Sequence, residues 1–106
     1  MSTKLTDIEI YIISEELSNQ IWGIVKHWHY FEKETLGRQL VRAADSISAN
    51  IAEAYGRYHY KDRQKFDYYA RGSFEETKSW LRKSYQRKLL NDSQIKIINT
   101  YIVLVI

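Results

Sequence analysis

Apolar side chains recur every three or four residues along four stretches of the chain, which is the spacing of one face of an α-helix. This spacing predicts helices over residues 7–28, 34–55 and 61–88, and a last helix with Asp92 or Ser93 as its N-cap. The chain has no proline and four glycines among its 106 residues, so it lacks the turn residues that sheet proteins need. Both observations indicate an all-α protein.

Local signals mark the ends of these helices. Thr6 and Glu9 form a capping-box pattern at the start of the first helix. Gly56 follows the second helix, where we expect the left-handed conformation that ends many helices, and residues 57–60 then form the connection. Short connections place successive helices side by side in opposite directions. The sequence therefore predicts a single domain over residues 1–106, an antiparallel up-down-up-down four-helix bundle.

The apolar stripes indicate which residues form the core. The last helix also has an apolar face that the core does not account for. The stripe of the first helix includes Leu17 and Ile21 and continues in register to Phe31. The last helix also carries Ile97 and Leu104 outside its own stripe. A helix that is apolar on several sides at the edge of a small bundle commonly meets another subunit, so we expect a homo-oligomer.

Several classes of chemistry find no support in the sequence. The absence of cysteine excludes disulfides and thiolate metal sites and fits a reducing cytoplasm. His27 and His29 would point to different faces of one helix, and motifs for nucleotide binding or nucleophilic catalysis are missing. The apolar run over residues 102–106 is too short to cross a membrane. We expect a cytoplasmic protein with no metal, cofactor, membrane contact or enzymatic activity.

Five polar residues share one face of the second and third helices at offsets of three and four. They are Ser46, Asn50 and Glu53 on the second helix, and Ser73 and Glu76 on the third. We expect Asn50 and Glu53 to be half-buried and to bond across to Ser73, forming a polar clasp that fixes helix pairing. A catalytic carboxylate with an amide stabiliser is the alternative. It would need a solvent-open pocket at the clasp and lacks a nucleophile or cofactor motif.

The basic residues are unevenly distributed along the chain. Residues 1–37 carry a net charge of −3 and the remainder +6, within a total of +3. Between residues 57 and 88, lysines and arginines alternate with tyrosines and Trp80, a combination that can contact phosphates and bases. The same pattern is also typical of a solvated helix face. The candidate nucleic-acid contacts are Arg57, Lys61, Arg63, Arg82, Lys83 and Arg87.

The segment from Gly37 to Arg57, which reads GRQLVRAADSISANIAEAYGR, resembles the signature of the four helix bundle protein family, also called the 23S rRNA intervening-sequence protein family. A second block, Phe66 with residues 70–74 and Glu76, is similar to that family's second motif, and the resemblance covers most of the chain. The matching positions imply a mainly architectural role. They are Arg38, Arg42, Ser46, Asn50, Glu53, Gly72, Ser73 and Glu76.

The resemblance also carries expectations about assembly and partners. It implies an antiparallel four-helix bundle without enzymatic activity, often assembled as a pentameric ring, and encoded in some bacteria within insertions of large-subunit ribosomal RNA genes. It further implies kinship with the accessory protein of diversity-generating retroelements, a basic pentamer for which nucleic acid and a reverse transcriptase are the expected partners.

Two hypotheses follow from the sequence. The first is an oligomeric bundle whose basic face contacts the backbone of RNA or DNA, beside a possible protein partner. The second is a protein-interaction scaffold whose aromatic and apolar surfaces recruit a partner while the basic residues only solubilise it. The dependence of binding on salt separates them, because phosphate contacts release counterions and apolar contacts do not.

Overall fold

A computed structural model describes residues 6–105, and these residues form helices joined by short turns, with no strand among them. The long helices are α1 (Asp7–Val25), α3 (Arg38–Tyr55), α4 (Tyr60–Gln86) and α5 (Asp92–Val105). A single turn, α2 (Tyr30–Glu32), and a π-helical turn, η1 (Lys33–Gly37), lead directly into α3. The predicted all-α class and the four long helices are confirmed.

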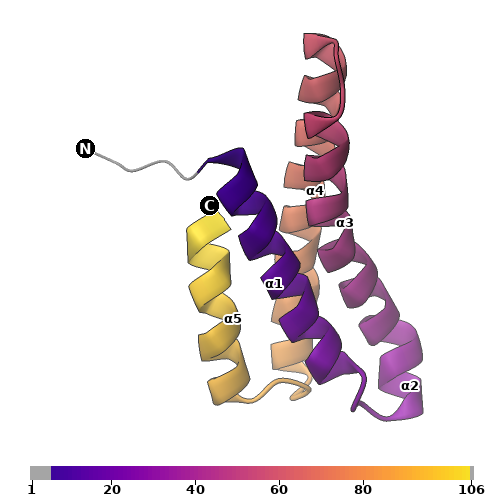
Figure 1. Cartoon of the computed structure of the whole chain (residues 1–106). Helices are drawn as coiled ribbons and strands as arrows, with labels where there is room; N and C mark the ends of the chain where they lie inside the picture. The colour runs from indigo at the N-terminus through magenta and orange to yellow at the C-terminus, as the bar shows by residue number, and fades with distance from the viewer. Residues whose placement is uncertain (1–5, 106) are drawn as a thin grey trace.

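The long helices run alternately down and up the molecule in the order of the chain (Figure 1). α3 packs against α4, α1 packs against α3, and α5 packs chiefly against α1. The Cα atoms span 43 × 32 × 18 Å, so the thinnest dimension accommodates two layers of helices. α5 approaches α1 more closely than it approaches α4. The turn joining α3 to α4 extends beyond the first turn of α1 and the last turn of α5 (Figure 1).

The core is formed by the stripes that the sequence predicts. Leu17 and Ile21 of α1, Leu40 and Ile47 of α3, and Ile98 of α5 are almost completely inaccessible to solvent. Phe74 and Leu81 of α4 join the same apolar cluster. Burying these aliphatic and aromatic side chains supplies the main driving force that holds the four helices together.

The corner between α1 and α2 departs from the sequence prediction. The first helix ends at Val25 and not at residue 28, and Phe31 is 70% exposed although it continues the apolar stripe in register. Trp28 folds back against the core, so the chain reverses before Phe31. Gly37 permits this close approach, since a Cβ there would lie 2.7 Å from Val25 Cγ1 and 3.3 Å from Trp28 Cε3.

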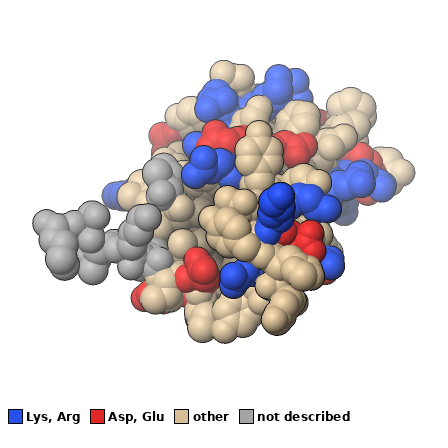
Figure 2. Space-filling view, turned by 90° about the horizontal axis from the view of Figure 1, so that it is seen from above, with Lys and Arg blue, Asp and Glu red and all other residues tan. Residues whose placement is uncertain are grey.

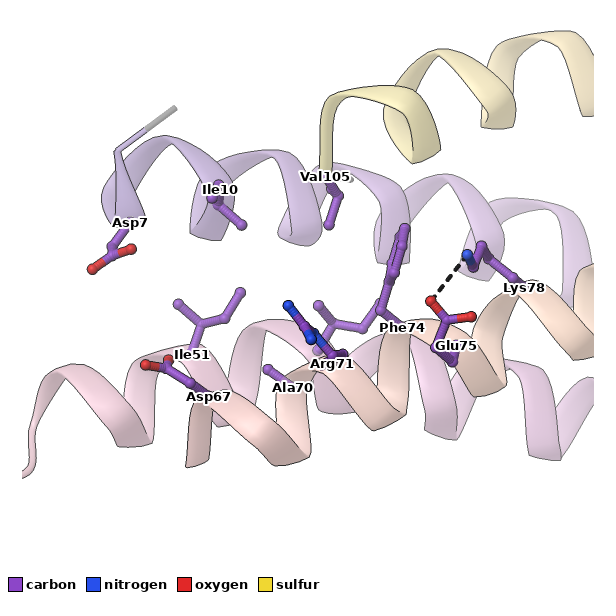
Figure 3. Close-up of a pocket in the computed structure, with 11 residues that line it drawn as sticks. Asp7, Ile10, Ile51, Asp67, Ala70, Arg71, Phe74, Glu75, Lys78 and Val105 are labelled. Atoms are coloured by element: carbon purple, nitrogen blue, oxygen red, sulfur yellow. Dashed lines mark ion pairs between the residues drawn. The ribbon is translucent and has the colours of Figure 1, made fainter. Parts of the chain in front are cut away.

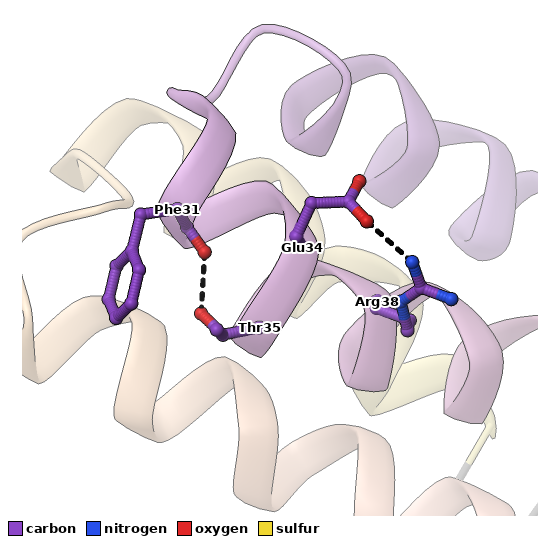
Figure 4. Close-up of polar contacts among 4 residues, drawn as sticks. All are labelled: Phe31, Glu34, Thr35 and Arg38. Atoms are coloured by element: carbon purple, nitrogen blue, oxygen red, sulfur yellow. Dashed lines mark hydrogen bonds and ion pairs between the residues drawn. The ribbon is translucent and has the colours of Figure 1, made fainter.

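The π-helical turn η1 is held by local polar contacts. Thr35 Oγ1 donates a 2.7 Å hydrogen bond to the carbonyl oxygen of Phe31, and the Arg38 guanidinium pairs with the Glu34 carboxylate (Figure 4). These bonds run along the direction of the helix, so α2, η1 and α3 act as one continuous rod that begins four residues before the predicted second helix.

The helix ends confirm one prediction and correct two. The capping box between Thr6 and Glu9 forms as predicted, with both hydrogen bonds present. Gly56 has φ −80°, so the left-handed end expected there is wrong. A left-handed residue occurs at the end of α4 instead, where Lys88 has φ 63° and Leu89 N–H donates to the Ser84 carbonyl in a Schellman arrangement.

The N-cap of α5 is one residue earlier than predicted. Asn91 Oδ1 accepts from Gln94 N–H at 2.8 Å, and Asn91 N–H donates to Gln94 Oε1 at 2.9 Å. This reciprocal pair makes Asn91 the cap, and Asp92 becomes the first helical residue.

Candidate nucleic-acid interface

The six candidate contacts separate into two clusters at opposite ends of α4. The hairpin cluster, which we define as Arg57, Lys61 and Arg63, lies at the turn from α3 to α4. The terminal cluster, defined as Arg82, Lys83 and Arg87, lies where α4 ends. At 1.5 Å per residue, 26 residues of helix separate Lys61 from Arg87 by about 39 Å. The structure therefore divides the six candidates into two separate clusters of three.

The stretch of α4 between the clusters is mixed in charge. Glu75 pairs with Lys78 at 3.0 Å, and Glu76 Oε2 accepts from Trp80 Nε1 at 3.3 Å. Both carboxylates are exposed and would repel a phosphate. The basic stretch expected over residues 57–88 is consequently interrupted, and a nucleic acid touching both clusters must pass over a stretch with no net positive charge.

The hairpin cluster combines cations with exposed rings. Arg57 pairs with Glu53 at 2.9 Å, and its Cζ lies 4.6 Å from the centre of the Phe66 ring, which fixes the guanidinium against α4. Among the described carboxylates, none lies within 4.0 Å of Lys61 or Arg63. Tyr58 at the turn is 92% exposed. Figure 2 looks onto this end of the molecule and shows lysine and arginine side chains gathered over it, with carboxylates between them.

A groove runs beside the hairpin, along α4 and toward the first turn of α1. Its outer part has a volume of about 750 Å³ and is lined by Tyr55, Tyr60 and Tyr68 together with polar side chains. Its inner part, about 470 Å³, has an apolar floor that includes Phe74. Figure 3 shows the inner part, with Arg71 reaching from α4 into the hollow between that helix and α1.

Two carboxylates, Asp7 and Asp67, line the outer part of this groove. Burial raises the pKa of Asp67 above its ordinary value, the charge of Asp7 raises it further, and Arg63 opposes the shift. Arg63 and Arg71 line the outer groove together with both carboxylates. The charges inside the outer groove therefore balance, and the excess positive charge belongs to the hairpin around it.

The cross-helix polar clasp is not seen. Asn50 is half-buried as expected, but its Nδ2 donates to the Ser46 carbonyl of its own helix at 2.8 Å. Glu53 is exposed and pairs with Arg57 one turn later. The Ser73 carbonyl oxygen accepts from Thr77 Oγ1, and the Glu76 carboxylate accepts from Trp80 Nε1, both within α4. Polar groups on a helix find partners one turn away, and these residues use that option.

A polar link between helices forms elsewhere, between α1 and α3. Ser48 Oγ donates a 2.6 Å hydrogen bond to Glu15 Oε2. Burial raises the pKa of the nearby Asp45 carboxyl, a hydrogen bond from Ser18 opposes the shift, and the charge of Glu15 adds to it. The signal that could have revealed this link is Ser48 itself, a hydroxyl on the buried face of α3.

The described residues give no sign of a metal centre or a membrane span. Over residues 6–105, no three histidine, aspartate or glutamate side chains are grouped so that they could hold a metal ion. Within the same range, every helix is too short or too polar to traverse a bilayer.

Comparison with known proteins places the chain in a family. No curated protein matches it closely enough to count as a relative. The family described as 23S rRNA-intervening sequence protein matches residues 6–105, which include all four long helices and both sequence blocks described above. The chain therefore belongs to the 23S rRNA-intervening sequence protein family.

Proposed function

We propose that this protein is a non-enzymatic, homo-oligomeric antiparallel bundle that binds the phosphate backbone of RNA or DNA through the two cationic clusters of α4. Three of the candidate cations lie near each end of α4. Of these six side chains, only Arg57 has a described carboxylate within 4.0 Å, and this observation carries the proposal. Cations without such partners remain available to replace the counterions of a polyanion, and the release of those counterions drives binding.

The exposed apolar face of α5 supports assembly of several copies. Val103 is 69% exposed, and Ile97 and Leu104 are each about half exposed. Contact with another subunit would remove these aliphatic side chains from water. Symmetric assembly would also repeat both clusters around the particle and multiply the phosphate contacts. A pentamer, and kinship with the accessory protein of diversity-generating retroelements, belong to this proposal through family resemblance.

Charge reversal at the terminal cluster tests the proposal. The double variant Arg82→Glu/Lys83→Glu should abolish binding to labelled duplex DNA and structured RNA at low salt, while far-UV circular dichroism stays unchanged. The matched control is Arg42→Glu/Lys96→Glu, which makes the same change in net charge at two exposed residues outside both clusters. Full binding by the Arg82 and Lys83 variant, or equal loss in both variants, would contradict the proposal.

The second candidate function is a protein-interaction scaffold, and the apolar face of α5 is the observation that favours it. Under this alternative, the protein would not bind nucleic acid at any salt concentration. Light scattering of Val103→Lys/Leu104→Lys tests the role of the face, since loss of assembly is expected if it joins subunits. An unchanged mass would leave the face available for a different protein.

A further inference from the structure

The outer groove beside the hairpin contains a concentration of aromatic rings that phosphate binding does not explain. Tyr55 comes from the end of α3, and Tyr60 and Tyr68 come from α4, and all three line the same groove. Gln64 Nε2 donates to the Tyr60 hydroxyl at 3.2 Å, which helps to orient that ring. Exposed tyrosine rings of this kind can stack on flat, unsaturated ligands.

The charge inside the groove indicates which part of a nucleic acid fits it. Two arginines balance two carboxylates there, so the groove has little net attraction for a phosphate chain. The same groups, with the Gln64 amide, can donate to and accept from the edges of nucleobases. The cations that attract a strand lie around the groove, at Arg57 and Lys61.

We infer that this groove binds unpaired nucleotides of a single-stranded RNA or DNA, with their bases stacked on Tyr55, Tyr60 and Tyr68. The inference rests on the proposed nucleic-acid binding and goes further by naming the single strand as the ligand. Duplex bases are already stacked on each other, so their faces are not available to tyrosine rings. The hairpin cations hold the backbone, and the rings distinguish a single strand from a duplex.

The spacing of the rings agrees with an extended strand. Tyr60 and Tyr68 are eight residues apart on α4, a rise of about 12 Å along the helix axis. Successive nucleotides of one strand advance by about 3.4 Å in a duplex and by more when stretched. The two rings therefore contact different nucleotides of one strand.

Fluorescence anisotropy with end-labelled oligonucleotides tests the inference. The probes are a 12-nucleotide oligo(U) RNA, a 12-nucleotide oligo(dT) and a 12-base-pair DNA duplex, all at the same ionic strength. Tyr60→Ala/Tyr68→Ala should weaken binding of the single strands by about tenfold or more. Binding of the duplex should change less than twofold, because the hairpin cations are intact.

Two further variants control for the loss of an exposed ring. Tyr60→Phe/Tyr68→Phe keeps the aromatic faces and should retain single-strand binding within a few-fold of the natural protein. Tyr30→Ala removes a ring that is 77% exposed, close to the 74% of Tyr68, but lies near the other end of the bundle, and it should leave binding unchanged.

The outcomes separate this inference from the proposed function. If the natural protein binds the probes but Tyr60→Ala/Tyr68→Ala binds single strands equally well, the stacking groove is wrong and phosphate binding stands. An equal loss for single strands and duplex would also contradict a groove selective for unpaired bases. If the natural protein binds none of the three probes, both proposals fail.

Discussion

The Ser48 hydroxyl on α3 lies 2.6 Å from Glu15 Oε2 on α1 and donates a hydrogen bond to it. This bond joins two residues that are 33 positions apart in sequence and lie on different helices. It therefore specifies how α1 pairs with α3, in addition to the apolar contacts between them.

Removing this hydroxyl should destabilise the fold. Ser48→Ala is expected to lower the free energy of unfolding by about 1–2 kcal/mol, because the bond joins a buried donor to a charged acceptor. Urea unfolding followed by circular dichroism measures the change. Ser46→Ala is the matched control on the same helix, since its hydroxyl bonds only to the carbonyl of Arg42, and it should cost less. Equal decreases in the free energy of unfolding of the two variants would contradict a special role for the Ser48 hydroxyl.

The raised pKa of Asp45 predicts a particular dependence of stability on pH. Burial makes the folded state hold this proton more tightly than the unfolded state, so stability falls as pH rises from the ordinary value of 3.8 through the folded pKa. Asp45→Asn removes that titration. The variant should gain stability relative to the natural protein between about pH 3 and pH 6. If the stabilities of the variant and the natural protein change with pH in parallel over this range, the raised pKa of Asp45 is contradicted.

Gly37 and Gly72 should respond in opposite directions to replacement by alanine. A Cβ at Gly37 would lie 2.7 Å from Val25 Cγ1 and 3.2 Å from the Glu32 carbonyl oxygen, so Gly37→Ala should cost about 1–3 kcal/mol. Gly72 is exposed on α4 with nothing within 4 Å of the added carbon, so Gly72→Ala should stabilise by about 0.5–1 kcal/mol. Thermal unfolding measures the change in stability of each variant. If both variants are stabilised, or both destabilised, the close packing of Gly37 against Val25 is contradicted.

The left-handed conformation of Lys88 predicts a stabilising substitution. A residue with a Cβ is strained at φ 63° and glycine is not, so Lys88→Gly should raise the free energy of unfolding by about 0.5–1 kcal/mol. Lys96→Gly makes the same chemical change inside α5, where glycine should cost about 1 kcal/mol. Chemical denaturation of both variants is the measurement. Destabilisation by Lys88→Gly would show that the Schellman turn does not form as described.

Periodicity predicted the long helices well because the buried stripe is a property of each helix taken alone. Leu17, Ile21 and Ile98 are buried for that reason. Phe31 continues the spacing of the stripe in the sequence. Because α1 ends at Val25, the turn that follows changes the direction of the chain, and Phe31 no longer lies on the buried face. Lys88 gave no signal, since lysine has no preference for left-handed φ; the turn is held by backbone hydrogen bonds from Lys88 N–H to the Tyr85 carbonyl and from Leu89 N–H to the Ser84 carbonyl.

The sequence predicted less of the candidate site than of the fold. Residue types grouped six cations as one candidate set, but the length of α4 divides them between two ends of the molecule. The polar clasp failed because helical spacing places Asn50 near the partner helix without deciding which hydrogen bond it makes, and the bond one turn away prevails. The groove of tyrosines depends on where α1 begins relative to the hairpin, which no local pattern contains.

The most direct test of the account is the salt dependence of nucleic-acid binding by the natural protein. The affinity for a DNA duplex should be measured from 50 to 200 mM salt and plotted as the logarithm of the association constant against that of salt concentration. Phosphate binding predicts a steep linear decrease, with a slope of about −0.9 per phosphate contacted. Binding that does not change with salt, or no binding at 50 mM, would contradict it.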